Sequence, residues 1–240
     1  MKTAIVTGGT KGIGAAIVEM LLADGYKVIT TYGNDDDAAR KFAQSHSEYS
    51  LGQLIVEKVD QADVAQIVHF TDKLKLYGKI DCLICNAGAT LRKNIDEITN
   101  EDWERIMMVN VNSNLYFVRD LFNQLSSNAR IIFIGSLMGV YPHGTSLAYG
   151  VSKSAVHALA KNLVKFFEGT GTTVNTIAPG FVETEWQKDK PERIRKSIYA
   201  KTAQRRFASV NEIVSAVKFC IGNAFVNGAV IEVSGGYCYK

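Results

Sequence analysis

Ser136, Tyr149 and Lys153 are the residues of this sequence whose types and spacing could do chemistry. Tyr149 and Lys153 lie four residues apart in a stretch that predicts a helix, so both side chains should face the same way. A phenol has a pKa of about 10, and a nearby cation lowers that value because it favours the phenolate. Such a tyrosine can exchange a proton with an alcohol or a carbonyl group. Ser136 could hydrogen-bond the same oxygen.

The elements around these residues would have to position them. An apolar strand over Ile131–Ile134 leads into Ser136, and a loop containing glycine separates it from the helix of Tyr149. A tyrosine and a lysine at this spacing also occur by chance on solvated helix surfaces. The rest of the chain has to decide between that interpretation and a catalytic one.

Length and composition are those of a soluble globular protein, and they exclude several classes. The chain has 240 residues, of which 47% are hydrophobic and 21% charged, with a net charge of +3. That charge is too small to predict a nucleic-acid partner, and no apolar run approaches the ~20 residues of a membrane helix. The chain enters a predicted strand at once, without a signal peptide. We therefore expect a cytoplasmic protein with no membrane partner.

Cys82 and Cys85 form a Cys-x-x-Cys pattern, which could indicate a redox pair. They fall in the predicted strand 81–85, where residues three apart point to opposite faces. Sulfurs on opposite faces of a sheet cannot reach disulfide geometry. We therefore expect buried, reduced thiols, and we expect no metal site.

A glycine-rich loop follows the first predicted strand, Thr3–Val6. Gly8, Gly12 and Gly14 precede a helix with an apolar face, and a second strand over 26–31 follows. This unit places a pyrophosphate on a helix N-terminus, and its glycines permit the tight turn and the close approach. The spacing Gly-x-x-x-Gly-x-Gly differs from the commoner dinucleotide pattern. A plain structural turn is the alternative.

Strands and helices alternate along the remaining chain without a low-complexity linker. Further strands are expected over 53–59, 80–85, 131–134, 172–177 and 229–233, with helices beginning near 35, 63, 99 and 210. Asn110 falls inside the long helix expected from Thr99, an unfavourable place for an asparagine unless its amide bonds something specific. The alternation predicts one doubly wound parallel sheet in a single α/β domain, residues 1–240.

Six motifs in this order resemble the short-chain dehydrogenase/reductase family over the whole chain. They are Thr7-Gly8-x-x-x-Gly12-x-Gly14, Asn86-Ala87-Gly88, Asn110, Ser136, Tyr149-x-x-x-Lys153, and Pro179-Gly180 with Thr184. The resemblance implies an NAD(P)-dependent oxidoreductase with a Rossmann-like, seven-stranded sheet of strand order 3-2-1-4-5-6-7. With these other motifs present, we interpret Tyr149 and Lys153 as catalytic residues rather than as a chance pair on a solvated helix surface.

The resemblance also implies a role for each motif. Tyr149 would be the general acid in carbonyl reduction and the base in the reverse reaction. Lys153 would bind the nicotinamide ribose and lower the tyrosine pKa. Ser136 would hold the carbonyl, and Asn110 would anchor a water for a proton relay.

For the cofactor, the resemblance implies that Asp60 meets the adenine ring, Asn86 supports the adenosine ribose, and Thr184 contacts the nicotinamide amide. The whole expected cofactor-binding set is Gly8, Thr10, Lys11, Gly12, Ile13, Gly14, Tyr32, Asp60, Asn86, Ala87, Gly88, Tyr149, Lys153, Pro179, Gly180 and Thr184.

NADP(H) is expected in preference to NAD(H), which is the alternative. The second strand ends in 30–33 without an acid at its tip, whereas an acid there would bind the ribose hydroxyls of NAD. Lys11 could meet a 2′-phosphate as a point charge. Asp35, Asp36 and Asp37 argue the other way, because they would repel that phosphate if their loop folds back.

Within the family, 179–184 and 227–236 look most like 3-oxoacyl-(acyl-carrier-protein) reductases of fatty acid biosynthesis. Cys85 departs from the usual asparagine, and Asn123 and Thr170 stand where those reductases often carry arginines that dock the carrier. The expected substrate is a carbonyl compound that is either a small molecule or linked to an acyl carrier. A 3-oxoacyl thioester is the leading candidate. A sugar, polyol or steroid alcohol dehydrogenase is the alternative. A non-catalytic nucleotide-sensing protein is the alternative of another class.

A basic segment lies where the family places its mobile substrate lid, here about 183–206. Over 187–206 it holds eight lysines and arginines against Asp189 and Glu192, a local balance of six positive charges. Such a lid would steer an anionic substrate toward the site, more weakly as salt rises. A solvated surface helix is the alternative.

A homotetramer is expected, mainly from the resemblance. Apolar residues occur on more than one face of the predicted helices near 110–125 and 154–167. Val109, Leu115, Phe117, Phe122, Phe166 and Phe167 cannot all face one sheet.

Overall fold

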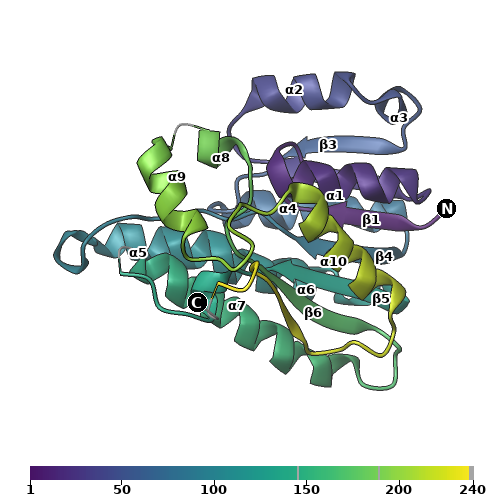
Figure 1. Ribbon diagram of the computed structural model, residues 1–240. Coiled ribbons are helices and arrows are strands. Elements are labelled where there is room, and N and C mark those ends of the chain that lie inside the picture. Colours follow the sequence, from purple (N-terminus) through teal and green to yellow (C-terminus); the bar gives the residue numbers. More distant parts are fainter. Residues whose placement is uncertain (145, 189, 238–240) are drawn as a thin grey trace.

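A parallel sheet forms the centre of the computed structural model, which describes residues 1–144, 146–188 and 190–237 (Figure 1). In order across the sheet, its seven strands are β3 (Leu54–Lys58), β2 (Lys27–Tyr32), β1 (Thr3–Val6), β4 (Ile80–Cys85), β5 (Leu125–Ile134), β6 (Thr173–Pro179) and β7 (Val230–Val233). Neighbouring strands are parallel throughout. The predicted strand order is confirmed.

Helices cover both faces of this sheet (Figure 1). They are α1 (Gly12–Ala23), α2 (Asp36–Gln44), α3 (Ser47–Ser50), α4 (Val64–Leu74), α5 (Asn100–Met107), α6 (Ser113–Asp120), α7 (Leu147–Leu163), α8 (Glu185–Lys188), α9 (Glu192–Tyr199) and α10 (Val210–Gly222). Short 3-10 turns are η1 (Lys75–Tyr77), η2 (Ile95–Glu97), η4 (Phe122–Gln124), η5 (Leu137–Gly139) and η6 (Val164–Phe167). No helix in the described ranges is long and apolar enough to cross a membrane.

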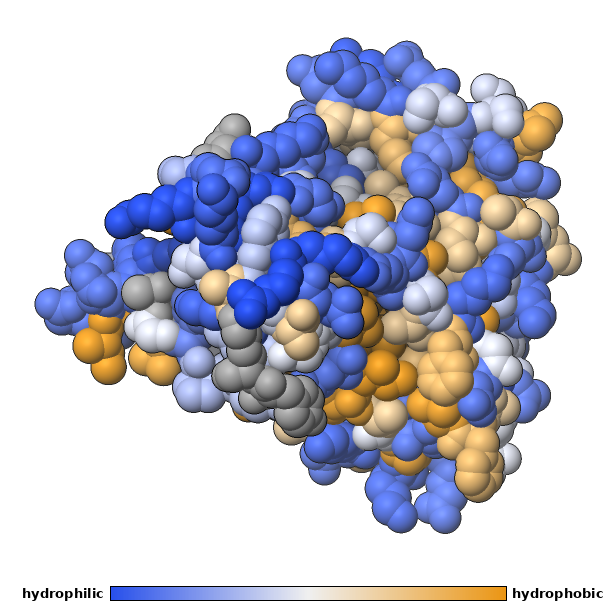
Figure 2. Space-filling view, viewed as in Figure 1, coloured by the Kyte–Doolittle hydropathy of each residue, from blue (hydrophilic) through white to orange (hydrophobic). Residues whose placement is uncertain are grey.

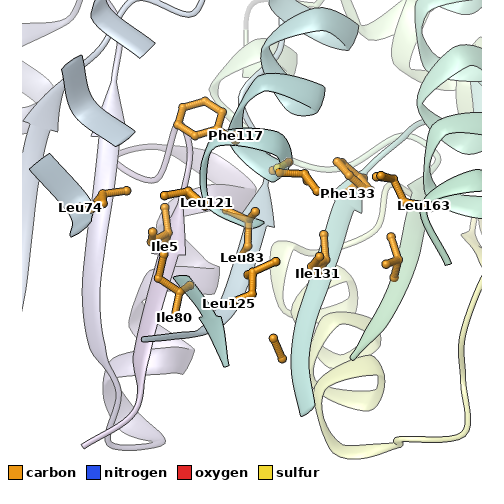
Figure 3. Packing of buried hydrophobic residues seen from close by; sticks show 14 of the residues in the cluster. Ile5, Leu74, Ile80, Leu83, Phe117, Leu121, Leu125, Ile131, Phe133 and Leu163 are labelled. Carbon is orange, nitrogen blue, oxygen red and sulfur yellow. The ribbon is translucent and has the colours of Figure 1, made fainter. Parts of the chain in front are cut away.

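Two hydrophobic cores join the helices to the sheet. One packs α1, α2 and α10 on the first face, and the other packs α4, α6 and α7 on the second. Figure 3 shows the second core, where side chains of these helices lie against those of β1, β4 and β5. Because both faces are covered, β1 and β6 are buried at every position and β4 at every position but one, rather than at alternate positions.

The strands alternate between the two cores residue by residue. Cys82 belongs to the core of α1 and α10, whereas Cys85 belongs to the core of α4 and α7. Both thiols are free, and burial raises the pKa of Cys82 to about 12. The prediction of buried, reduced cysteines in this pair is confirmed. Among the described residues, no group of three or more His, Cys, Asp or Glu could hold a metal ion.

The long helix predicted from Thr99 is interrupted. Thr99 and Asp102 form a reciprocal capping box that starts α5. A π-helical turn, η3 (Met108–Asn112), then separates α5 from α6. Such a turn adds one residue to the helical repeat and is frequent at functional sites. The expectation of one continuous helix is therefore wrong at this turn, which contains Asn110.

Candidate active site

A cavity of about 510 Å³ lies at the carboxyl ends of the strands, around β1 and β4. These two strands are neighbours although their connections run to opposite sides of the sheet, which is where doubly wound proteins bind ligands. Of the predicted cofactor-binding residues, the lining includes Gly8, Lys11, Gly12, Ile13, Gly14, Tyr32, Asp60, Asn86, Ala87, Gly88, Tyr149, Lys153, Pro179, Gly180 and Thr184. Thr10 is buried and lies outside this lining.

The first turn of α1 forms a cradle at one end of the cavity. Lys11 occupies the N-cap position, but no side chain caps the helix. Gly8 has a φ of 65°, and a Cβ added to Gly14 would lie 2.2 Å from the Gly8 carbonyl oxygen. Gly12 and Gly14 therefore bring backbone N–H groups to the wall of the cavity. This arrangement fits the pyrophosphate of a dinucleotide, which binds at uncapped helix N-termini.

Asn86 fixes the loop after β4 to the loop after β1. Its Nδ2 donates to the carbonyl oxygens of Thr7 at 3.0 Å and Gly8 at 2.9 Å. The Thr7 hydroxyl accepts from the backbone N–H groups of Asn86 and Ala87, each at 3.0 Å. Sequence reasoning left Thr7 out of the site, although its place directly after β1 is a usable signal. These bonds fix the glycine loop at the carboxyl ends of β1 and β4.

Asn110 is fully buried in the π-helical turn, and its amide joins two segments. Its Oδ1 accepts from the backbone N–H of Ala89 at 2.8 Å, and its Nδ2 donates to the Ala89 carbonyl and to the Ser152 hydroxyl, each at 2.9 Å. Ser152 in turn donates to the Tyr149 carbonyl at 2.7 Å. Asn110 thus positions α7 against the loop after β4. Its expected role as a water anchor stays a prediction.

Ser136, Tyr149 and Lys153 meet at the other end of the cavity. The Tyr149 hydroxyl is hydrogen-bonded with Ser136. Lys153 Nζ lies 5.7 Å from the centre of the Tyr149 ring and donates to the carbonyl oxygen of Ile134 at 2.7 Å. The lysine is 3% exposed, so its ammonium is held inside the protein beside the phenol.

Burial governs the protonation of both groups. It raises the pKa of Tyr149, and the hydrogen bond with Ser136 opposes that rise. It also lowers the pKa of Lys153 to about 8. In the chain alone desolvation of the phenol sets the direction of this shift, and the expected lowering of the Tyr149 pKa by Lys153 stays a prediction. A raised pKa keeps the phenol protonated, as a proton donor requires.

His157 was missed from the sequence, although it stands one further turn along the face of Tyr149 and Lys153. Its Nε2 accepts from the backbone N–H of Ser136 at 3.4 Å. Burial, followed by the nearby Lys153, lowers the pKa of His157 to about 4. The imidazole is therefore neutral near pH 7 and supports the backbone of Ser136 from behind. A Cβ on Gly135 would lie 2.3 Å from the same nitrogen, so this packing requires the glycine.

The acids after β2 are engaged by neighbouring cations. Asp35 caps α2 through Ala38 and is paired with Lys11. Asp36 accepts from Lys58 at 2.9 Å and from the Tyr32 hydroxyl at 3.0 Å. None of the three acids at 35–37 lines the cavity, whereas Lys11 and Tyr32 do.

At least four of the eight cations counted over 187–206 are paired with carboxylates within the fold, although Figure 2 shows hydrophilic side chains over α8 and α9. Three of the partner carboxylates lie just outside the counted stretch, and Glu192 lies inside it. The pairs are Arg195 with Glu183, Lys188 with Glu185, Lys196 with Glu192, and Arg206 with Glu212. Of residues 187–206, only Gln187 is in the cavity lining within the described chain. Asp189 lies outside the described residues.

Comparisons with known proteins agree with this geometry. The family model described as short chain dehydrogenase matches residues 2–195. The 3-oxoacyl-(acyl-carrier-protein) reductase FabG of Escherichia coli (strain K12) is 31% identical, over 98% of this chain and 96% of that protein. The cyclic-di-GMP-binding biofilm dispersal mediator protein of the same strain is 29% identical, over 98% and 97%.

Solved structures give the same result. The crystal structure of a blue fluorescent protein from a metagenomic library, in complex with NADPH, matches with a TM-score of 0.91 at 30% identity, covering 99% of this chain and 98% of that one. The chain belongs to the short-chain dehydrogenase/reductase family. It is therefore an NAD(P)-dependent oxidoreductase, as the motifs predicted.

The depressed pKa of Lys153 predicts a pH profile. The ammonium is charged below about pH 8 and neutral above it. Because kcat/KM reports groups of the free enzyme, kcat/KM for the cofactor should be level below that pH and fall above it. In Lys153→Arg the guanidinium stays charged, so the fall should vanish from the remaining activity. A wild-type profile that stays level up to about pH 10 would contradict this assignment.

Proposed function

We propose that this protein reduces the carbonyl group of a 3-oxoacyl thioester to a secondary alcohol with NADP(H), in cytoplasmic fatty acid biosynthesis. One observation carries the proposal. The hydrogen-bonded Ser136 and Tyr149, with buried Lys153 beside them, line the same cavity as the uncapped first turn of α1. A proton donor and a dinucleotide cradle therefore share one cavity.

The residues divide the chemistry between them. Ser136 and Tyr149 would hold the substrate oxygen, and Tyr149 would donate its proton as the oxygen gains charge. The nicotinamide supplies the hydride when bound. Lys153 would hold the ribose and provide positive charge beside the phenol. In the reverse direction Tyr149 would accept the proton of the alcohol.

The walls near Ser136 favour an acyl chain over a sugar or polyol. They include Leu137, Met138, Tyr141, Pro142, Phe181, Val182 and Tyr237. This apolar part of the wall suits an acyl chain, whereas a polyol needs a hydrogen-bond partner for each hydroxyl. The 31% identity to a reductase of 3-oxoacyl thioesters supports the same choice.

Turnover tests the proposal directly. An acetoacetyl thioester should be reduced with NADPH faster than a hexose, a polyol or a steroid is converted. Tyr149→Phe should lower kcat by about 10²–10⁴-fold, because it removes the proton donor. Its affinity for NADPH, measured by fluorescence titration, should stay within a few-fold of wild type, which separates chemistry from binding.

Two results would contradict the proposal. Faster conversion of the sugar or steroid would favour the alcohol dehydrogenase alternative. Cofactor binding without turnover of any carbonyl would favour a nucleotide-binding protein, a class to which the name of the biofilm dispersal relative points. Intact Ser136, Tyr149 and Lys153 argue for the enzyme.

The preference for NADP(H) rests on the end of β2. The lining there includes Thr31, Tyr32, Gly33 and Asn34, with no carboxylate, and Lys11 faces them across the glycine loop. A 2′-phosphate would find a cation rather than an acid. Lys11 is paired with Asp35, however, and the Asp35 carboxylate would therefore compete with the 2′-phosphate for Lys11. NADPH or NADP in complexes of similar structures supports this choice.

The competition predicts opposite effects of two variants. Lys11→Ala should raise KM for NADPH about fivefold, because it removes the point charge. Asp35→Asn should lower KM for NADPH, because it keeps the oxygen that caps α2 and releases Lys11. Neither variant should change KM for NADH by more than about twofold. Steady-state kinetics with both cofactors measure this, and a wild-type preference for NADH would refute the cofactor choice.

A homotetramer is the proposed assembly. Of the apolar residues that suggested it, Val109, Phe117 and Phe167 are buried, but Leu115, Phe122 and Phe166 are exposed. Phe219 and Phe225 add a second exposed group, and Figure 2 shows hydrophobic side chains gathered where α10 ends. These two exposed groups offer apolar area for contact with other copies of the chain.

Light scattering tests the assembly. The mass should be four times that of one chain, and Phe166→Asp should reduce it, because the new charge would be buried in an interface. Tyr49→Asp, an exposed aromatic residue away from both surfaces, serves as the control and should keep the wild-type mass. A monomer at every concentration would refute the tetramer.

A further inference from the structure

Two arginines outside the predicted site line the cavity. Arg92 lies in the loop between β4 and α5, and Arg105 lies in the last turn of α5. Both are exposed residues that share this lining with Ser136 and Tyr149. No motif contains either arginine, so sequence analysis gave no reason to select them.

Neither arginine is neutralised by the protein. Arg92 and Arg105 have no carboxylate or other hydrogen-bond partner among the described residues. The nearby carboxylate of Asp102 is bound to Lys93 at 2.5 Å. This distinguishes the two arginines from the lid cations Arg195 and Lys196, each of which has a glutamate.

The cavity itself offers no acid to them. Its lining contains two carboxylates, Asp60 and Glu185. Asp60 follows β3 at the adenosine end, where its Oδ1 accepts from the backbone N–H of Ala62. Glu185 is paired with Lys188. The substrate end therefore carries positive charge that an anionic ligand would balance.

Two other titratable groups lie near Arg92. His143 lines the same end, and its Nδ1 is buried without a hydrogen-bond partner among the described residues. Burial, Lys201 and Arg92 together lower the pKa of His143, and Arg92 also contributes to a lowered pKa of Lys190. These effects show that Arg92 lies close to both groups. Of these groups Arg92 and Lys190 are cations, and neighbouring cations raise the local concentration of anions.

We propose that Arg92 and Arg105 form an anion subsite that binds a phosphate or carboxylate group carried by the carbonyl substrate. A guanidinium binds either group through two parallel hydrogen bonds, which a lysine cannot do. The proposal rests on the proposed function, because it assumes that the carbonyl substrate occupies this cavity. The negative charge of the substrate would then be bound by the loop after β4 and by α5, instead of by the lid at 183–206.

A pair of substrates that differ by one phosphate tests the subsite. The acetoacetyl thioester of 4′-phosphopantetheine should be reduced with kcat/KM about 10-fold higher than the acetoacetyl thioester of pantetheine. In Arg92→Gln/Arg105→Gln this ratio should fall to about one, while NADPH titration checks that the cofactor site is folded. Arg193→Gln removes an equal charge from the exposed face of α9, outside the cavity lining. It should keep the wild-type ratio.

A second pair separates the two sources of the anion. Levulinate and its methyl ester carry the same ketone, with and without a carboxylate. A preference for levulinate that the double variant loses, with no preference in the thioester pair, would assign the subsite to a carboxylate close to the carbonyl. The reverse pattern would assign it to a phosphate farther away.

Binding keeps the test independent of turnover. With saturating NADP⁺, calorimetry should show tighter binding of 4′-phosphopantetheine than of pantetheine, or of levulinate than of its ester, and the double variant should lose the difference. If no thioester is reduced but this difference remains, the proposed activity fails and the subsite stands. If wild type shows no preference in any pair, or Arg193→Gln loses as much as the double variant, the subsite is refuted.

Discussion

The hydrogen bonds that join the ends of β1 and β4 are the constraint on which the site depends. Asn86 Nδ2 binds two carbonyl oxygens of the first loop, and the Thr7 hydroxyl accepts two N–H groups of the second. They satisfy backbone groups that a diverging pair of strands leaves open. Asn110 extends the connection from Ala89 to Ser152 on α7. One chain of bonds therefore links the glycine cradle to the helix of Tyr149.

This framework holds a buried ammonium that the protein does not neutralise. Among the described residues, Lys153 has a hydrogen bond to the Ile134 carbonyl and no carboxylate partner. A buried charge without a counterion is costly, and its pKa shifts accordingly. Gly88 leaves room for the neighbouring Asn110, since a Cβ there would lie 3.2 Å from its Oδ1. Such an ammonium is a functional rather than a stabilising feature, and it suits a site completed by a ligand.

The sheet could be predicted from the sequence because its strands are buried on both faces and separated by regular helical patterns. Most strand ends differed by a residue or two, as for β2 at Tyr32, but β5 begins at Leu125, six residues before the strand predicted over 131–134. The π-helical turn at Asn110 could not be predicted, because it depends on partners 21 and 42 residues away. The pKa of Tyr149 could not be predicted either. Its sign depends on how much solvent the surrounding elements remove, which no local spacing contains.

Charge shows the same limit of sequence reasoning. The lid segment looked strongly basic because Glu183, Glu185 and Glu212 fell outside the stretch that was counted. In space these carboxylates are the partners of its cations. Arg92 and Arg105 looked ordinary, since charged residues surround them in the chain. What makes a cation available to a ligand is the absence of a carboxylate within reach together with a place on a cavity wall. Both properties belong to the fold, so the total charge of a segment cannot show where an anion binds.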